Sequence, residues 1–157
     1  AGGSGLGLID YVKQAKCLKE GGAIRFVRKA DPYAKVPKYA DYTKTCGTDG
    51  TKATPLFFIG VDANQNYLGD TDNNPNTLNH GLTSMLKRVD VATYEVIKSV
   101  VQKAFKGGVR EFGLANNGVG YALDEYNKAL IPAAVVSKLE VLKQQIIKGQ
   151  LKVPEKR

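Results

Sequence analysis

The sequence predicts an α/β lobe in which helices flank a mostly parallel sheet. Helical and strand-like hydrophobic patterns alternate along the 157 residues, as is typical of chains that place helices between the strands of one sheet. Residues 56–61 form a continuous apolar run of strand length, as expected for a strand buried on both faces. The length suits one domain, residues 1–157, with enough chain to bury a core.

The sequence pattern of the N-terminal third predicts one helix followed by an irregular segment. Apolar residues at positions 8, 11, 12 and 15 have helical spacing, and Gly21 and Gly22 should end this helix. Residues 23–27 predict a short strand. Prolines and a Gly-Thr-Asp-Gly turn then interrupt residues 31–55. We therefore expect an irregular insertion at about residues 17–55, followed by the buried strand.

After a polar loop, residues 82–89 predict the next strand. Asp90 is a plausible N-cap for the helix that follows, and an apolar stripe continues through this helix to Gly107 and Gly108, which should end it.

The C-terminal part predicts a hairpin and a last helix. Strand patterns at 109–114 and 119–123 flank an Asn-Asn-Gly sequence at 116–118, and Asn-Gly favours a tight hairpin turn. Pro132 suits the first turn of a helix, and Gly149 suits its end.

Composition excludes several classes of protein. The net charge is +8, but the 23 basic residues are scattered among 15 acidic ones without a basic block. This pattern indicates a solvated basic surface, and we expect no specific binding of nucleic acid. The sequence also lacks an apolar run of about 18 residues, the length that a membrane-spanning helix needs.

The two cysteines, Cys17 and Cys46, are not arranged as a Cys-x-x-Cys motif, which argues against a zinc or thioredoxin-like site. In an exported protein, a disulfide between them would close a loop of about 30 residues and contribute roughly 3–4 kcal/mol. In a reducing compartment they would be two unrelated thiols.

Three polar features fall where an α/β sheet places its ligands, outside the carboxyl ends of its strands. Gly2 and Gly3 open the first helix, where free amides can receive an oxygen-rich ligand. Asp62 follows the buried strand and can accept hydrogen bonds from sugar hydroxyls, and Lys87 near the end of the next strand can donate to the same ligand. Each feature also has a structural explanation, as chain geometry, a turn residue or surface charge.

The sequence offers no set of residues for catalysis. The single histidine, His80, lies in a polar loop, and neither a Gly-x-Ser-x-Gly elbow nor metal-ligand spacing is present. We therefore predict a protein that is not an enzyme.

Five motifs in order resemble the basic membrane protein family, the substrate-binding lipoproteins of nucleoside ABC uptake systems, which include receptors for purine nucleosides. The matching segments cover about the first 16 and the last 100 residues. They are AGGSGLG at 1–7, IGVDANQ at 59–65, LTSMLKRVD at 82–90, FGL at 112–114 with GVGY at 118–121, and IIKGQLKVP at 146–154.

The resemblance implies a lobe of the type I periplasmic-binding fold, whose ligand lies between two lobes. It places Gly2, Gly3, Asp62 and Lys87 at positions that hold the ribose of a nucleoside, with Gln65 as a further candidate. It implies no cofactor, a membrane permease as partner, and an extracytoplasmic lipoprotein anchored through its N-terminus. Export also strengthens the prediction of a Cys17–Cys46 disulfide.

The resemblance also implies a missing part. The chain begins at the glycine turn, so the family's first lobe and the strand before Ala1 are absent from this sequence. We expect that lobe as a separate chain or as a cleaved segment. Two alternatives use the same fold, a ligand-sensing regulatory domain and a surface-interaction protein.

Overall fold

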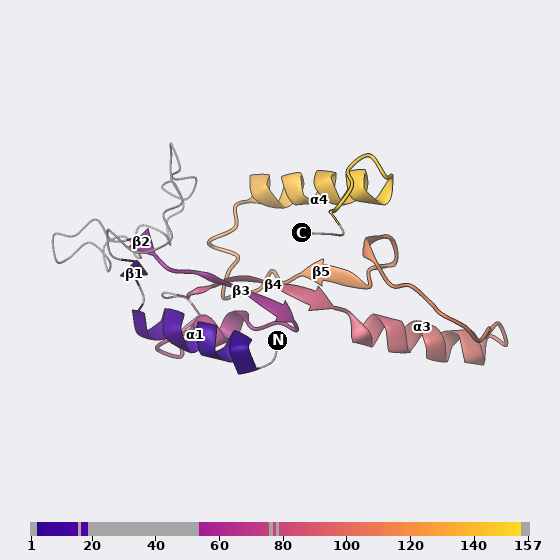
Figure 1. Cartoon of the computed structure of the whole chain (residues 1–157), viewed down its shortest axis with the longest axis horizontal. Coiled ribbons are helices and arrows are strands. Elements are labelled where there is room, and N and C mark those ends of the chain that lie inside the picture. Colours follow the sequence, from indigo (N-terminus) through magenta and orange to yellow (C-terminus); the bar gives the residue numbers. More distant parts are fainter. Residues whose placement is uncertain (1–2, 16, 19–53, 76, 78, 155–157) are drawn as a thin grey trace. The chain divides into compact units, whose positions relative to one another are not determined.

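A computed structural model describes residues 3–15, 17–18, 54–75, 77 and 79–154 (Figure 1). The chain divides into two compact units. The first contains Ala1–Met85 and Ala122–Pro132, and the second contains Leu86–Tyr121 and Ala133–Arg157. Helices and strands are interspersed along the described chain, which confirms the predicted α/β class.

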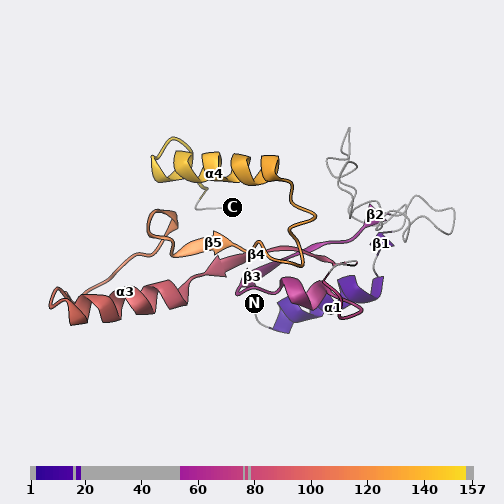
Figure 2. The same cartoon turned by 180° about the vertical axis from the view of Figure 1, so that it is seen from behind.

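In the first unit, helix α1 (Gly3–Ala15) packs against strand β3 (Phe58–Asp62). α1 runs back along β3 in the opposite direction (Figures 1 and 2). Ile9 and Val12 from the helix and Phe58 from the strand form a buried cluster. Each such side chain contributes about 1.5–3 kcal/mol on burial, so this cluster fixes the helix on the strand. α1 ends at Ala15, before the glycine pair that we expected to end it.

The sheet is mixed and has the strand order β3-β4-β5. β3 and β4 (Gly81–Lys87) point the same way (Figure 1). β5 (Val119–Tyr121) runs antiparallel to β4, because Ala122 donates its backbone N–H to Ser84 at one end and Arg88 donates its N–H to Gly118 at the other. β4 therefore confirms the strand predicted over residues 82–89, although it ends two residues earlier.

A second, small sheet joins β1 (Cys17–Leu18) to β2 (Thr54–Pro55), which pair antiparallel. These two strands flank the predicted insertion at about residues 17–55. Residues 19–53, which include the strand predicted over 23–27, lie outside the described residues.

The prediction that residues 56–61 would be buried on both faces is wrong. Phe58 and Gly60 are buried, whereas the side chains of Ile59 and Val61 are 59% and 40% exposed. Successive strand residues point to opposite faces. α1 packs on the face that carries Phe58, so only every second residue of β3 is buried.

In the second unit, helix α3 (Val89–Val101) begins one residue before the predicted N-cap. Arg88 occupies the cap position, and the Asp90 carboxylate pairs with the Arg88 guanidinium at 2.8 Å. The expected end at Gly107 and Gly108 is also wrong. Lys103 adopts a left-handed φ of 56°, and the backbone N–H groups of Lys103 and Ala104 bond to Val100 and Ser99, which closes the helix with a Schellman motif.

Helix α4 (Ala133–Ile147) starts directly after Pro132. Gly149 has a φ of 69°, and the N–H groups of Gly149 and Gln150 bond to Ile146 and Gln145. This is the same Schellman closure, and it confirms Gly149 as the residue that ends the helix.

The hairpin predicted around residues 116–118 is wrong in its first strand. Residues 109–113 form no strand, and a short 3-10 helix, η2 (Leu114–Asn116), precedes β5. The Asn116 side chain accepts the Gly113 N–H at 2.8 Å and donates to the Glu111 carbonyl at 2.9 Å. These bonds use backbone groups that a strand would have paired in a ladder.

Neither α3 nor α4 has a buried residue. No helix among the described residues combines the length and the apolar character needed to cross a bilayer.

Candidate functional site

Asp62 ends β3 in an unusual backbone conformation. Its φ is 76°, in the left-handed region that residues other than glycine seldom adopt. Asp tolerates this region better than most residues, but holding a non-glycine residue there costs of order 1–3 kcal/mol. Such strain persists only where the surrounding structure fixes it, and it is common where a side chain must be aimed at a ligand.

Gln65 closes the turn that follows Asp62. Its Oε1 atom accepts the Val61 backbone N–H at 3.0 Å, and its own backbone N–H donates to the Ser84 hydroxyl at 2.9 Å. The chain then enters the 3-10 helix η1 (Asn66–Gly69). The amide oxygen of Gln65 is thus engaged within the turn, and its Nε2 group is the part of the side chain suited to a ligand.

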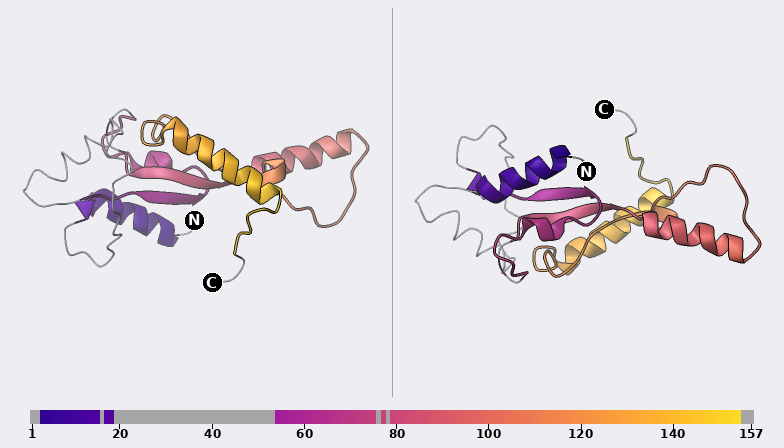
Figure 3. Two further views of the ribbon diagram at one scale, coloured as in Figure 1. Left: turned by 90° about the horizontal axis from the view of Figure 1, so that it is seen from above. Right: turned by 90° about the horizontal axis from the view of Figure 1, so that it is seen from below.

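Gly3 is the first residue of α1, and Gly2 lies outside the described residues. The amino end of α1 and the carboxyl end of β3 lie at the same end of the first unit (Figures 1 and 3). The free N–H groups at the start of a helix attract oxygen atoms. This end of the first unit therefore combines amide donors with the Asp62 carboxylate.

Lys87 is the last residue of β4 and belongs to the second unit. Its side chain is exposed. A flexible ammonium group at a strand end is a donor of up to three hydrogen bonds.

A buried polar network supports the turn after β3, and sequence reasoning missed it. Asn66, Ser84 and Asn127 are all 0% exposed. Ser84 donates its hydroxyl to Asn66 Oδ1 at 2.8 Å, and Asn66 Nδ2 donates to Asp124 Oδ2 at 3.1 Å. Asn127 Nδ2 donates to the carbonyls of Leu82 and Ala122. Asparagines in polar loops usually indicate solvated turns, and only Ser84, in the middle of a predicted strand, hinted at this network.

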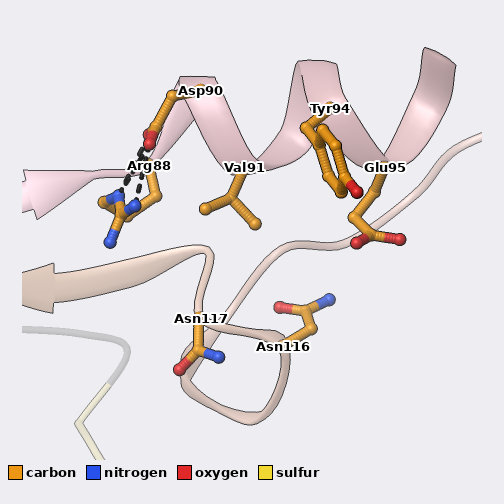
Figure 4. Close-up of a pocket in the computed structure, with 7 residues that line it drawn as sticks. All are labelled: Arg88, Asp90, Val91, Tyr94, Glu95, Asn116 and Asn117. Atoms are coloured by element: carbon orange, nitrogen blue, oxygen red, sulfur yellow. Dashed lines mark hydrogen bonds and ion pairs between the residues drawn. The ribbon is translucent and has the colours of Figure 1, made fainter. Parts of the chain in front are cut away.

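The second unit has an open hollow of about 540 Å³ (Figure 4). Its lining residues are Arg88, Asp90, Val91, Tyr94, Glu95, Asn116 and Asn117. The hydrogen bond from Arg88 holds the pKa of Asp90 below its usual range, and the same bond raises the pKa of Arg88. Both groups are therefore firmly charged and paired with one another, so neither is suited to proton transfer.

The described residues provide no group of three or more His, Cys, Asp or Glu side chains able to hold a metal ion. His80 is buried, with Nδ1 2.7 Å from the Leu56 carbonyl oxygen. Its backbone carbonyl accepts the Phe58 N–H. These bonds give His80 a structural role beside the start of β3.

Cys17 begins β1. Cys46 lies outside the described residues, so its predicted pairing with Cys17 stays a prediction.

Comparison with known proteins adds relatives of two kinds. The chain is 38% identical over 103 residues to the CD4+ T-cell-stimulating antigen of Listeria monocytogenes. It is 60% identical over 35 residues to an uncharacterised lipoprotein of Pyrococcus abyssi. No protein-family model matches the chain.

The matches cover parts of longer proteins. The Listeria match takes in 64% of this chain and 28% of the antigen, and the Pyrococcus match takes in 22% of this chain and 9% of the lipoprotein. Among solved structures, an ABC transporter solute-binding protein from Aeropyrum pernix aligns with a TM-score of 0.44 and 27% identity, over 75% of this chain and 38% of that one.

Proposed function

We propose that this chain is part of the solute-binding component of an ABC uptake system, and that its ligand is a nucleoside, with purine nucleosides as the first candidates. In this role the protein binds a solute and delivers it to a membrane permease, and no covalent bond is made or broken. The five ordered motifs of the basic membrane protein family support the proposal, as does the similarity to bacterial and archaeal proteins that include a lipoprotein.

The observation that carries the proposal is the conformation and position of Asp62. The residue sits at the carboxyl end of β3 with a φ of 76°, at the edge where α1 begins. A carboxylate there can accept two hydrogen bonds from the neighbouring hydroxyls of a ribose. Amides at the start of α1, near Gly2 and Gly3, would donate to the sugar oxygens.

Lys87 and Gln65 complete the proposed set of ligand-binding residues. Lys87 would donate from its ammonium group, and Gln65 would contribute its Nε2 donor, since its Oε1 atom bonds to Val61. In the proposed mechanism a second lobe, present in a longer protein or as a separate chain, closes over the ligand by a hinge motion. The protein would work outside the cytoplasm, anchored by a lipidated N-terminus.

Calorimetric titration of the two-lobed protein tests this proposal. Inosine, guanosine and adenosine are compared with free ribose, which carries the sugar without a base. We expect nucleosides to bind. Asp62→Asn and Lys87→Met should each weaken binding about 10- to 100-fold, because hydrogen bonds to charged groups contribute about 1.5–3 kcal/mol.

Asp10→Asn and Lys98→Met are matched controls. Asp10 lies exposed on α1, and Lys98 lies exposed on α3, where it pairs with Glu95. Both controls should bind like the unaltered protein. Lack of nucleoside binding by the unaltered protein, or equal losses in the control variants, would overturn the proposal.

A further inference from the structure

The turn after β3 is connected to a second turn that is distant in sequence. Asp124 Oδ2 accepts hydrogen bonds from Asn64 Nδ2 at 2.7 Å and from Asn66 Nδ2 at 3.1 Å. Its Oδ1 atom accepts the Tyr126 backbone N–H at 2.9 Å. Asn127 Oδ1 in turn accepts the Asp124 N–H at 2.8 Å. The Asp124 carboxylate is therefore fixed by its own turn and fixes residues 64–66.

The connection continues to the residue beside Asp62. Asn66 Oδ1 accepts the Ser84 hydroxyl, and the Ser84 oxygen accepts the Gln65 N–H. Gln65 Oε1 then accepts the N–H of Val61, the neighbour of Asp62. An unbroken chain of hydrogen bonds thus runs from Asp124 to the backbone that carries Asp62.

Burial makes the middle of this chain cooperative. Asn66 and Ser84 are 0% exposed, so water cannot replace a lost bond between them, whereas the bonds of Val61 to Gln65 and of Asn64 to Asp124 are exposed. In such surroundings hydrogen bonds are strong, and an unsatisfied buried donor or acceptor is destabilising. Breaking one bond leaves neighbouring groups without partners, so the members should open together.

We propose that Asp124 is a positioning residue for Asp62. Its carboxylate holds residues 61–66 in the conformation that keeps Asp62 at a left-handed φ, and the two turns open and close as one unit. The inference rests on the proposed function in one respect, because the proposed function assigns Asp62 a ligand. Asp124 itself is assigned no contact with the ligand.

Amide hydrogen exchange of this chain, measured by NMR, tests the coupling without a ligand. Asp124→Asn keeps the size of the side chain but replaces one acceptor oxygen with a donor, which opposes the donors of Asn64 and Asn66. We expect the amides of Val61, Gln65 and Asn66 to exchange at least about tenfold faster. The Phe58 amide, which bonds to the His80 carbonyl at 2.9 Å, should keep its rate.

Asp72→Asn is the matched control. Asp72 accepts bonds from Asn74 and Thr77 in the exposed turn of the same unit, apart from the network. It should leave the three amides unchanged. If Asp124→Asn fails to fold, Asn64→Ala replaces it, because Asn64 is exposed and supplies one of the two side-chain donors to Asp124. Asn64 Oδ1 also accepts the Asn66 N–H at 3.0 Å, so only the amides of Val61 and Gln65 test the coupling in this variant.

Unchanged exchange at Val61, Gln65 and Asn66 would overturn the proposal. An equal acceleration of exchange at the Phe58 amide would also overturn it, because it would show a purely global loss of stability. Inosine titration of the two-lobed protein is the second measurement. Asp124→Asn should weaken binding about tenfold and Asp72→Asn should not. Unchanged affinity in Asp124→Asn would refute the positioning role, whereas absence of inosine binding by the unaltered protein would refute the proposed function and leave the exchange data to decide the coupling.

Discussion

Replacing Gly60 with alanine tests how tightly the end of β3 is packed. A Cβ atom built on Gly60 would lie 2.5 Å from the Ser84 hydroxyl oxygen and 2.9 Å from Gln65 Cβ, well inside the 3.4 Å at which ordinary contacts begin. Gly60 is itself buried, so the new methyl group cannot turn toward solvent. Either the strand shifts or the Ser84 side chain rotates away.

Both responses are costly. Overpacking of a close-packed interior typically costs about 1–3 kcal/mol. Rotation of Ser84 would break its bonds to Gln65 and Asn66, and each buried polar group left without a partner costs about 1–3 kcal/mol. We therefore expect Gly60→Ala to destabilise the first unit by about 2–4 kcal/mol, a large fraction of the stability of an ordinary domain.

Urea unfolding followed by circular dichroism measures the change, and amide exchange at Phe58 and Gln65 assigns it to the first unit. The control is Gly120→Ala in β5, because nothing lies within 4 Å of a Cβ atom built there. Gly120→Ala should change stability by less than about 0.5 kcal/mol. A Gly60→Ala protein as stable as the control would refute the packing of β3 against Ser84 and Gln65.

Two further predictions concern charge and covalent structure. The hydrogen bond from Arg88 lowers the pKa of Asp90, so the titration midpoint of this carboxyl, followed by NMR, should lie below its ordinary value of 3.8. A lowered folded pKa means that the stabilisation is present above 3.8 and is lost as the pH falls through the folded midpoint. Arg88→Gln should return the midpoint toward 3.8, and an unshifted midpoint in the unaltered protein would contradict the ion pair. Second, if Cys17 pairs with Cys46, the intact mass should rise by two hydrogens on reduction and stability should fall by roughly 3–4 kcal/mol; a mass insensitive to reductant would exclude the bond.

Several features followed from local sequence alone. The first helix and the closing role of Gly149 are set by residues within one or two turns of helix, and the structure confirms both. The predicted apolar face is only partly right, because Val12 is buried whereas Leu8 and Tyr11 are 56% and 63% exposed, and Ile9 is buried in their place. The strand over residues 82–89 and the place of Asp62 after the apolar run 56–61 were also predictable. Short-range patterns suffice here, because backbone periodicity and helix capping depend on neighbours in the chain.

Other features were decided by side-chain contacts that the sequence patterns did not predict, although the contacting residues are close in the chain. The hairpin failed because the Asn116 side chain takes up the backbone groups of Glu111 and Gly113. Asp90 failed as a cap because Arg88 engages its carboxylate. In both cases local sequence allowed two partners for one polar group, and the folded arrangement selected the one that propensity did not favour.

The candidate site shows the same division. Sequence indicated Asp62, but not its left-handed φ or the network that supports it. Asp124 lies 58 residues from Asn66 along the chain, and Ser84 lies 18 residues from it. Local sequence patterns do not predict contacts between residues so far apart in the chain. The residue types at this turn were thus set by sequence, whereas the burial of Asn66 and Ser84 arose only when distant turns met, because a polar side chain can leave water only where the fold supplies its hydrogen-bond partners.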